Sequence, residues 1–149
     1  MIGFTEKELG DTLTERLLNL ARLRQVLDTY RVSAPIHLFG ALDPLYSPLY
    51  FAAGAEIFDG LSWLRYAYHD GLAVHPEVNT VLHASLDDRA TLREAKRCLQ
   101  NLGALKVLKR SMQRYASTNG DGFREYGSHW AALATTFSTV QAMLESGDR

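Results

Sequence analysis

The sequence predicts an α/β fold of about three parallel strands followed by C-terminal helices. Short apolar runs alternate with helical patterns from the N-terminus to Gly71, an order typical of parallel α/β units. After Gly71 the alternation ends and two long helical patterns follow. The 149 residues therefore divide into a strand-and-helix segment, residues 1–71, and a second segment, residues 72–149. We expect the second segment to be an irregular connection and a helical region packed on the first.

The first strand and the first long helix are predicted within the N-terminal 30 residues. Residues 2–5 (Ile-Gly-Phe-Thr) have a β-leaning composition. Thr12 and Glu15 have the spacing of a capping box, in which each side chain binds the backbone N–H of the other residue. A helix is expected from about Thr12 to Tyr30, because apolar residues recur on one helical face. These are Leu13, Leu17, Leu20, Leu27 and Tyr30.

Two more strand-and-helix pairs complete the first segment. Residues 36–40 (Ile-His-Leu-Phe-Gly) form a short apolar run, which suits a buried parallel strand. Asp43-Pro44 marks a turn that begins a short helix, and Gly54 closes this helix. Residues 56–60 predict another short strand. A further helix is expected from Leu61 to Tyr68.

The second segment is predicted to be mainly helical. Residues 72–86 have no clear pattern and are expected to be irregular. Residues 87–115 predict a helix with a possible interruption at Gly103, and residues 117–122 predict a loop. Residues 123–144 predict a last amphipathic helix. Its apolar face consists of Tyr126, Trp130, Leu133, Phe137, Val140 and Leu144.

Composition excludes several classes of protein. Lys and Arg total 16 and Asp and Glu total 17, so the net charge of −1 gives no overall preference for polyanions. The single cysteine, Cys98, allows neither an internal disulfide nor a cysteine cluster for zinc. No apolar run reaches the roughly 18 residues of a membrane helix. The charged residues Glu6, Lys7 and Glu8 argue against a secretory signal, so a cytoplasmic protein is expected.

Residues 35–71 carry the most specific pattern in the chain. The pattern begins with His37-Leu38-Phe39-Gly40, continues with Ala-Gly-Ala-Glu-Ile-Phe-Asp at residues 53–59, and ends with Arg-Tyr-Ala-Tyr-His-Asp-Gly at residues 65–71. In order and spacing, these pieces resemble the C-terminal barrel region of the tRNA-guanine transglycosylase family, including its DNA-modifying relatives. The resemblance covers about half of the chain.

The resemblance implies a fold, a reaction and a nucleophile. The fold would be a partial (β/α) barrel, because a complete eight-stranded barrel needs about 250 residues. Enzymes of this family exchange guanine in nucleic acid for a 7-deazaguanine derivative. The carboxylate that matches Asp59 would attack C1′ of the ribose and hold a covalent glycosyl intermediate. The family's second catalytic Asp and most of its purine pocket lie on earlier strands, so a partner chain would have to supply them.

The position of Asp59 is compatible with this role. The residue follows a predicted parallel strand, and the active sites of α/β barrels lie at the carboxyl ends of the strands. A carboxylate is also a suitable nucleophile toward an oxocarbenium-like sugar carbon. The alternative is a helix N-cap, since an Asp between a strand and a helix often has that role.

Basic residues suggest contacts with tRNA or DNA. The resemblance implies a nucleic-acid contact for Arg65. Between residues 89 and 114 there are eight basic residues and only Glu94 opposes them, which is typical of a phosphate-binding face. The predicted nucleic-acid contacts are Arg65, Arg89, Arg93, Lys106, Lys109, Arg110 and Arg114. The alternative is an ordinary solvated helix face.

No cofactor or metal is expected. The family's zinc site uses three cysteines and a histidine, whereas the corresponding part of this chain holds only Cys98 and three histidines. His69, His75 and His83 are six and eight residues apart in a segment predicted to be irregular, without a close pair of ligands. His37 is expected to pack at the end of its strand. Aromatic residues near the motif are expected mainly to fill the core.

Three functions stay open at this point. The first is a transglycosylase-like subunit or fragment that acts on tRNA or DNA with a partner carrying the N-terminal half of the barrel, or as a homo-oligomer. The second is a non-catalytic remnant that binds nucleic acid or regulates a complete enzyme. The third is an unrelated small α/β module. Because three strands cannot close a barrel, we also expect association through the strand edge at residues 2–5, unless the C-terminal helices cover the exposed face.

Overall fold

The computed structural model describes residues 1–118 and 122–147, and its first half alternates strands and helices. The elements of this half are β1 (Ile2–Thr5), α1 (Glu6–Leu9), α2 (Leu13–Thr29), β2 (Ile36–Phe39), α3 (Tyr46–Ala52), β3 (Ile57–Phe58) and α4 (Ser62–Arg65). The second half contains β4 (Ala67–His69), β5 (Leu72–Val74), α5 (Pro76–Leu82), α6 (Ala90–Ser117), η1 (Phe123–His129) and α7 (Trp130–Ser146).

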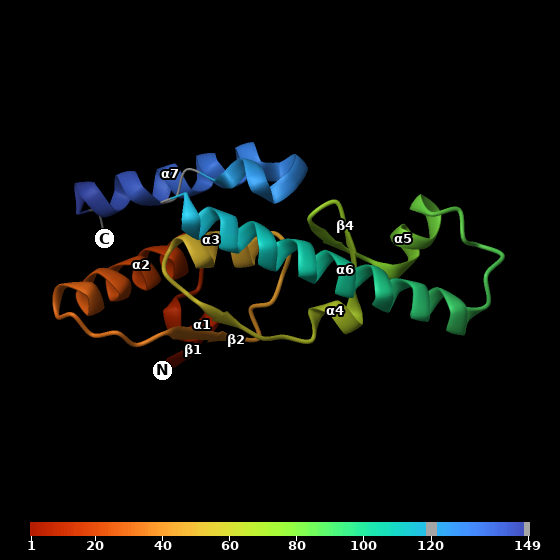
Figure 1. Ribbon diagram of the computed structural model, residues 1–149, viewed down its shortest axis with the longest axis horizontal. Helices are drawn as coiled ribbons and strands as arrows, with labels where there is room; N and C mark the ends of the chain where they lie inside the picture. Colours follow the sequence, from red (N-terminus) through yellow and green to blue (C-terminus); the bar gives the residue numbers. More distant parts are fainter. Residues whose placement is uncertain (119–121, 148–149) are drawn as a thin grey trace.

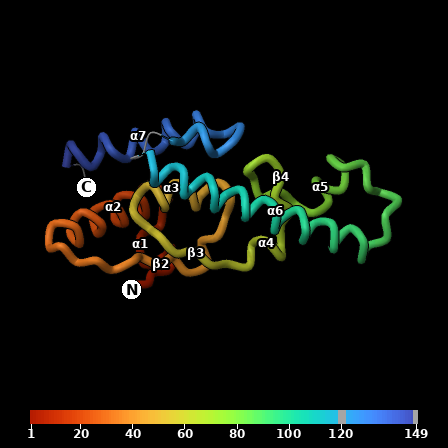
Figure 2. The backbone as a smooth tube through the Cα atoms, in the orientation of Figure 1, coloured from red at the N-terminus to blue at the C-terminus, as the bar shows by residue number. Residues whose placement is uncertain are grey.

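Strands β1, β2 and β3 form a parallel sheet in sequential order, which confirms the predicted strands and the C-terminal helices that follow them. Gly3 pairs with His37, and His37 pairs with Ile57. In Figures 1 and 2 the sheet lies along one border of the molecule, with α2, α3 and α7 on the same side of it. The sheet is open, and neither β1 nor β3 pairs with another strand of the described residues on its outer edge. A barrel is therefore not established by this sheet.

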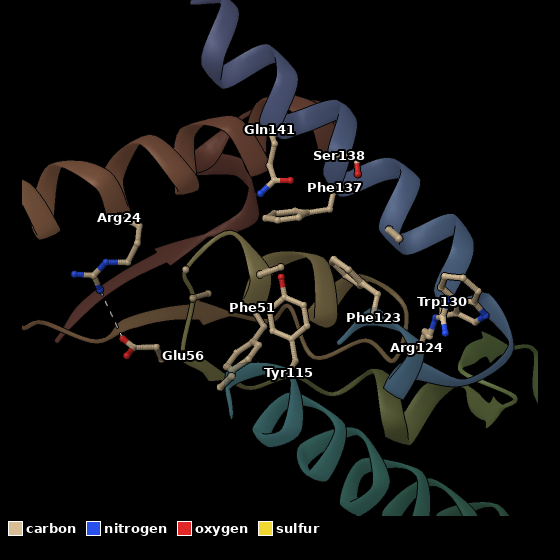
Figure 3. Close-up of a pocket in the computed structure, with 15 residues that line it drawn as sticks. Arg24, Phe51, Glu56, Tyr115, Phe123, Arg124, Trp130, Phe137, Ser138 and Gln141 are labelled. Atoms are coloured by element: carbon tan, nitrogen blue, oxygen red, sulfur yellow. Dashed lines mark ion pairs between the residues drawn. The ribbon is translucent and has the colours of Figure 1, made fainter. Parts of the chain in front are cut away.

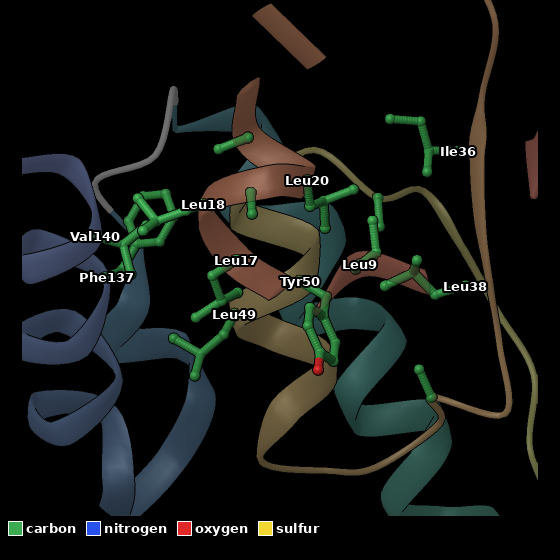
Figure 4. Close-up of a cluster of buried hydrophobic side chains, with 14 of the residues drawn as sticks. Leu9, Leu17, Leu18, Leu20, Ile36, Leu38, Leu49, Tyr50, Phe137 and Val140 are labelled. Carbon is green, nitrogen blue, oxygen red and sulfur yellow. The ribbon is translucent and has the colours of Figure 1, made fainter. Parts of the chain in front are cut away.

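The core lies between the sheet and its helices (Figure 4). Ile36 and Leu38 of β2 are completely buried, as expected for alternate residues on the covered face of a strand, and belong to the same core cluster as Leu17 and Leu20 of α2. Tyr50 of α3 is also completely buried. Helix α7 adds three buried residues to the same core, namely Leu133, Phe137 and Val140.

The predicted N-terminal capping box of α2 is confirmed. The backbone N–H of Glu15 donates to Thr12 Oγ1 at 3.2 Å, and the backbone N–H of Thr12 donates to Glu15 Oε2 at 3.0 Å. These bonds satisfy amides that the first turn of a helix leaves free. They also lower the pKa of Glu15, chiefly because the Thr12 amide binds the ionised carboxylate.

The helix expected from Leu61 to Tyr68 is wrong beyond Arg65. The chain instead forms an antiparallel hairpin, in which Tyr68 pairs with Ala73. The turn is Asp70-Gly71, and both residues have positive φ, at 47° and 75°. An Asp-Gly pair suits this kind of two-residue hairpin turn, because Gly accepts positive φ without steric cost and Asp tolerates it. The hairpin runs across residue 71, where the sequence placed a boundary between two segments.

Residues 72–86 are more regular than expected, since they contain β5 and α5. Helix α6 is continuous through Gly103. The last predicted helix is broken near its start, because Tyr126 and Gly127 within η1 have non-helical backbone angles and Gly127 has a positive φ of 77°. Of the loop expected at residues 117–122, residues 119–121 lie outside the described residues and Ser117 ends α6.

Candidate active site at the carboxyl edge of the sheet

Asp59 lies directly after β3, at the edge of the sheet where the carboxyl ends of the parallel strands meet. The backbone N–H of Gly40, which follows β2, donates to Asp59 Oδ1 at 2.7 Å. The backbone N–H of Leu42 donates to the Asp59 carbonyl at 2.9 Å. Two residues that follow β2 thus fix both the backbone and the carboxylate of Asp59.

Asp59 does not cap a helix, because the N-cap of α4 is Leu61. The N-cap alternative for Asp59 is therefore wrong. Gly60 allows the close approach of the two loops, since a Cβ on Gly60 would lie 3.1 Å from the Leu42 backbone N and 3.2 Å from the Gly40 carbonyl O. The local sequence Asp-Gly therefore places a carboxylate against the end of β2 without a side chain between the loops.

His37 is the second ionisable side chain at this edge. Its Nε2 lies 3.2 Å from Asp59 Oδ2, which is within the distance of an ion pair. The His37 side chain is 13% exposed and that of Asp59 is 55% exposed. The carboxylate thus has one oxygen on a backbone amide and the other beside an imidazole, and still faces solvent. An exposed, oriented carboxylate of this kind is able to act as a nucleophile or to bind a cationic group.

The segment after Asp59 is anchored by polar contacts to the β2 loop. Ser62 Oγ donates to the Leu42 carbonyl, and Tyr68 Oη donates to the same carbonyl at 3.1 Å and lies 2.6 Å from Ser62 Oγ. Burial raises the pKa of the Tyr68 hydroxyl, so it stays protonated and able to donate. Arg65, at the end of α4, is exposed and makes no ion pair with the described residues.

The basic residues of α6 do not form one continuous face. Arg89 and Arg93 lie at its start, and Lys106 lies 13 residues after Arg93, which corresponds to roughly 20 Å along a helix. Lys106, Lys109 and Arg110 are exposed, without ion pairs to the described residues.

Several basic side chains have structural partners that the sequence did not indicate. Arg114 pairs with Glu125 at 2.7 Å, and Lys96 pairs with Asp88 at 2.7 Å. Arg93 donates to a backbone carbonyl at 3.2 Å. Arg97, counted among the eight basic residues, is buried and donates to the carbonyls of two residues before β4. The exposed cationic surface is therefore smaller than the sequence suggests.

The three histidines of the second segment make different contacts. The rings of His69 and His83 meet edge to face with centroids 5.4 Å apart. His75 caps α5, because its Nδ1 accepts from the Glu77 backbone N–H at 3.3 Å. Within residues 1–118 and 122–147, no group of three His, Cys, Asp or Glu side chains is arranged to hold a metal ion. Cys98 is a half-buried free thiol.

A separate cavity of about 750 Å³ lies between α7, α3 and the end of α6 (Figure 3). Its aromatic lining includes Phe51, Tyr115 and Trp130. Glu56 lies at the amino end of β3, so this cavity lies toward the opposite end of the strands from Asp59. An ion pair of 3.9 Å joins Glu56 to Arg24 on its border. Phe51, one of the aromatic residues near the motif that were expected to fill the core, contacts Tyr115 edge to face.

Comparisons with protein-family models, with curated proteins and with solved structures gave no match for this chain. The resemblance to tRNA-guanine transglycosylases therefore depends on the motif residues themselves. None of the described helices combines the length and the apolar character needed to span a membrane.

Proposed function

We propose that this chain is part of a transglycosylase that exchanges guanine in tRNA or DNA for a 7-deazaguanine derivative, with Asp59 as the nucleophile. The observation that carries the proposal is the position of the Asp59 carboxylate. It is exposed at the carboxyl edge of a parallel sheet, is held by the Gly40 amide at 2.7 Å and has no helix-capping role. The carboxyl edges of parallel sheets are where α/β enzymes place their reactive groups.

The reaction follows from the chemistry of a carboxylate. One oxygen of Asp59 forms a bond to C1′ while the C1′–N9 bond breaks, and the electron pair of that bond leaves with the guanine, which takes up a proton. The incoming deazapurine loses a proton, attacks C1′ and releases Asp59. The group that transfers these protons would come from strands other than β1–β3. The purine pocket would come from the same strands.

The uncovered face of the sheet supports the need for a partner. Phe39 and Ile57 are 43% and 37% exposed on this face, whereas Ile36 and Leu38 on the other face are completely buried. Parallel sheets are nearly always covered on both faces. The outer edges of β1 and β3 are also unpaired among the described residues. We therefore propose that another polypeptide segment, or a second copy of the chain, adds strands beside β1 or β3 and covers this face.

The exposed cations of α6 favour nucleic acid as the ligand. Lys106, Lys109 and Arg110 lie three and four residues apart, so they are neighbours on one helical surface. A group of cations without carboxylate partners suits phosphate contacts. The same observation supports the alternative of a nucleic-acid-binding protein without catalysis.

The test is guanine exchange and covalent trapping. The full chain, with a protein that carries the N-terminal half of a transglycosylase barrel, is incubated with labelled guanine and tRNA or duplex DNA. Asp59→Asn should abolish both exchange and a denaturant-resistant adduct, while Asp87→Asn, a change at an exposed residue outside the site, should leave both intact. Exchange that persists at the same rate with Asp59→Asn would refute the nucleophile.

Binding without exchange would favour the alternative. In that case, replacing Lys106, Lys109 and Arg110 by Ala should weaken binding to nucleic acid and reduce its dependence on salt, because fewer counterions are released. Salt-independent binding, or binding that the triple variant does not change, would argue against nucleic acid as the ligand of this surface.

A further inference from the structure

His37 has a position that its expected packing role does not explain. It is the second residue of β2 and lies on the uncovered face of the sheet, between Gly3 and Ile57. Its ring packs against Phe39, with centroids 4.3 Å apart. Phe39 in turn covers Gly3, where a Cβ would come within 2.5 Å of the Phe39 ring. The small residue on β1 and the aromatic residue on β2 therefore fix the imidazole beside β3.

The fixed ring directs a buried nitrogen toward Asp59. His37 Nε2 lies 3.2 Å from Asp59 Oδ2 but forms no hydrogen bond to any described residue, because the geometry is not in line. A buried nitrogen of this kind is costly unless it is paired in a functional state. The Asp59 side chain is 55% exposed and that of His37 is 13% exposed, so the carboxylate has more freedom to turn toward the pair than the packed imidazole.

We propose that His37 is a positioning residue that donates its Nε2–H to Asp59 Oδ2 and fixes the rotation of the carboxylate for attack. This inference rests on the proposed function of Asp59. The Gly40 amide holds Oδ1 and His37 holds one lone pair of Oδ2, so the other lone pair of Oδ2 is directed to the open side of the sheet. In the reaction, the Oδ2–C1′ bond forms and the C1′–N9 bond breaks, with its electrons on the base. His37 keeps its proton throughout.

A neutral imidazole in this role has its proton on Nε2, and nitrogen NMR distinguishes this tautomer from the other. We expect the full chain at pH 8 to show the Nε2–H tautomer of His37. Asp59→Asn should shift His37 toward a mixture of tautomers, while Asp87→Asn should leave its spectrum unchanged. A wild-type spectrum dominated by the Nδ1–H tautomer, or one that Asp59→Asn does not alter, would overturn the proposal.

Kinetics give a second readout in the completed enzyme. His37→Leu fills the space with an apolar side chain but removes the donor. We expect kcat to fall by about a hundredfold with little change in KM, as for a misplaced reacting group. His37→Gln, whose terminal NH₂ lies near the position of Nε2, should restore a large part of kcat. Equal loss in both variants, or a change in KM alone, would contradict a positioning role.

The two proposals fail in different ways. If no exchange occurs with any partner, the proposed function is wrong, and the spectra still decide whether His37 holds Asp59. If Asp59→Asn abolishes exchange but does not change the tautomer of His37, the role of Asp59 as nucleophile is supported and the positioning role of His37 is refuted.

Discussion

Asn101 should be among the residues whose replacement destabilises this protein most. It is completely buried in α6, and its side chain makes three short hydrogen bonds. Its Oδ1 accepts from the Tyr68 backbone N–H at 2.7 Å, and its Nδ2 donates to the carbonyls of Trp63 and Tyr66 at 2.6 and 2.8 Å. One amide side chain thus attaches α4 and the β4–β5 hairpin to the long helix.

The cost of Asn101→Ala can be estimated group by group. The Tyr68 N–H would be left buried without a partner, which costs about 1–3 kcal/mol. The carbonyls of Trp63 and Tyr66 keep Arg97 as a donor, at 3.3 and 3.0 Å, so each loses only the net value of one bond, about 1 kcal/mol. We therefore expect the free energy of unfolding to fall by about 3–5 kcal/mol.

Urea unfolding followed by circular dichroism measures this loss, and amide hydrogen exchange at Tyr68 locates it. Gln113→Ala is the matched control, because Gln113 is an exposed amide residue on the same helix and should change stability by less than about 0.5 kcal/mol. Asn101→Asp keeps the acceptor but places an oxygen against two carbonyls, so it should destabilise as well. A loss below about 1 kcal/mol for Asn101→Ala, with unchanged exchange at Tyr68, would refute this reasoning.

Three further predictions concern the first segment. Thr12→Ala should cost about 1 kcal/mol in urea unfolding, because α2 loses its capping side chain, while Thr14→Ala should cost less. Glu15→Gln should lower Tm at pH values above 4.5, the ordinary pKa of Glu, because the Thr12 amide lowers the pKa of the folded carboxylate. This difference in Tm should vanish as the pH falls through the pKa of the folded state. Leu38→Ala should cost about 2–5 kcal/mol in urea unfolding, whereas the exposed Val107→Ala should be nearly neutral.

The parts of the fold that local sequence rules govern could be predicted. Capping at Thr12 depends on residues three positions apart, and the strand at β2 depends on a short apolar run with a Pro before it. The hairpin at Asp70-Gly71 also had a local signal, since Asp-Gly is a common turn pair. That signal was outweighed by an apparent helical spacing of apolar residues. The segment is too short to distinguish the helical period of about 3.6 residues from the strand period of about 2.

The parts that depend on distant contacts could not be predicted. In the sequence, Arg97 is one more cation of a basic helix, but the carbonyls that it binds are 31 and 34 residues away. His37 reads as a packed strand residue, and only the register of β2 with β3 brings it to Asp59. The position of Asp59 after a strand was predictable. Its hydrogen bond to Gly40 required the two loops to meet in space.

The Asp59 carboxylate and the uncovered face of the sheet lie on the same side of the molecule. A sheet face meant for water would alternate polar residues outward, but here the outward residues of β2 and β3 include Phe39 and Ile57. The Asp59–His37 pair lies at the carboxyl edge of that same face. A partner that covers this face would also enclose the carboxylate and exclude water from it. Exclusion of water strengthens the electrostatic interactions of a reacting group. Assembly on the sheet and reactivity at Asp59 should therefore depend on the same partner.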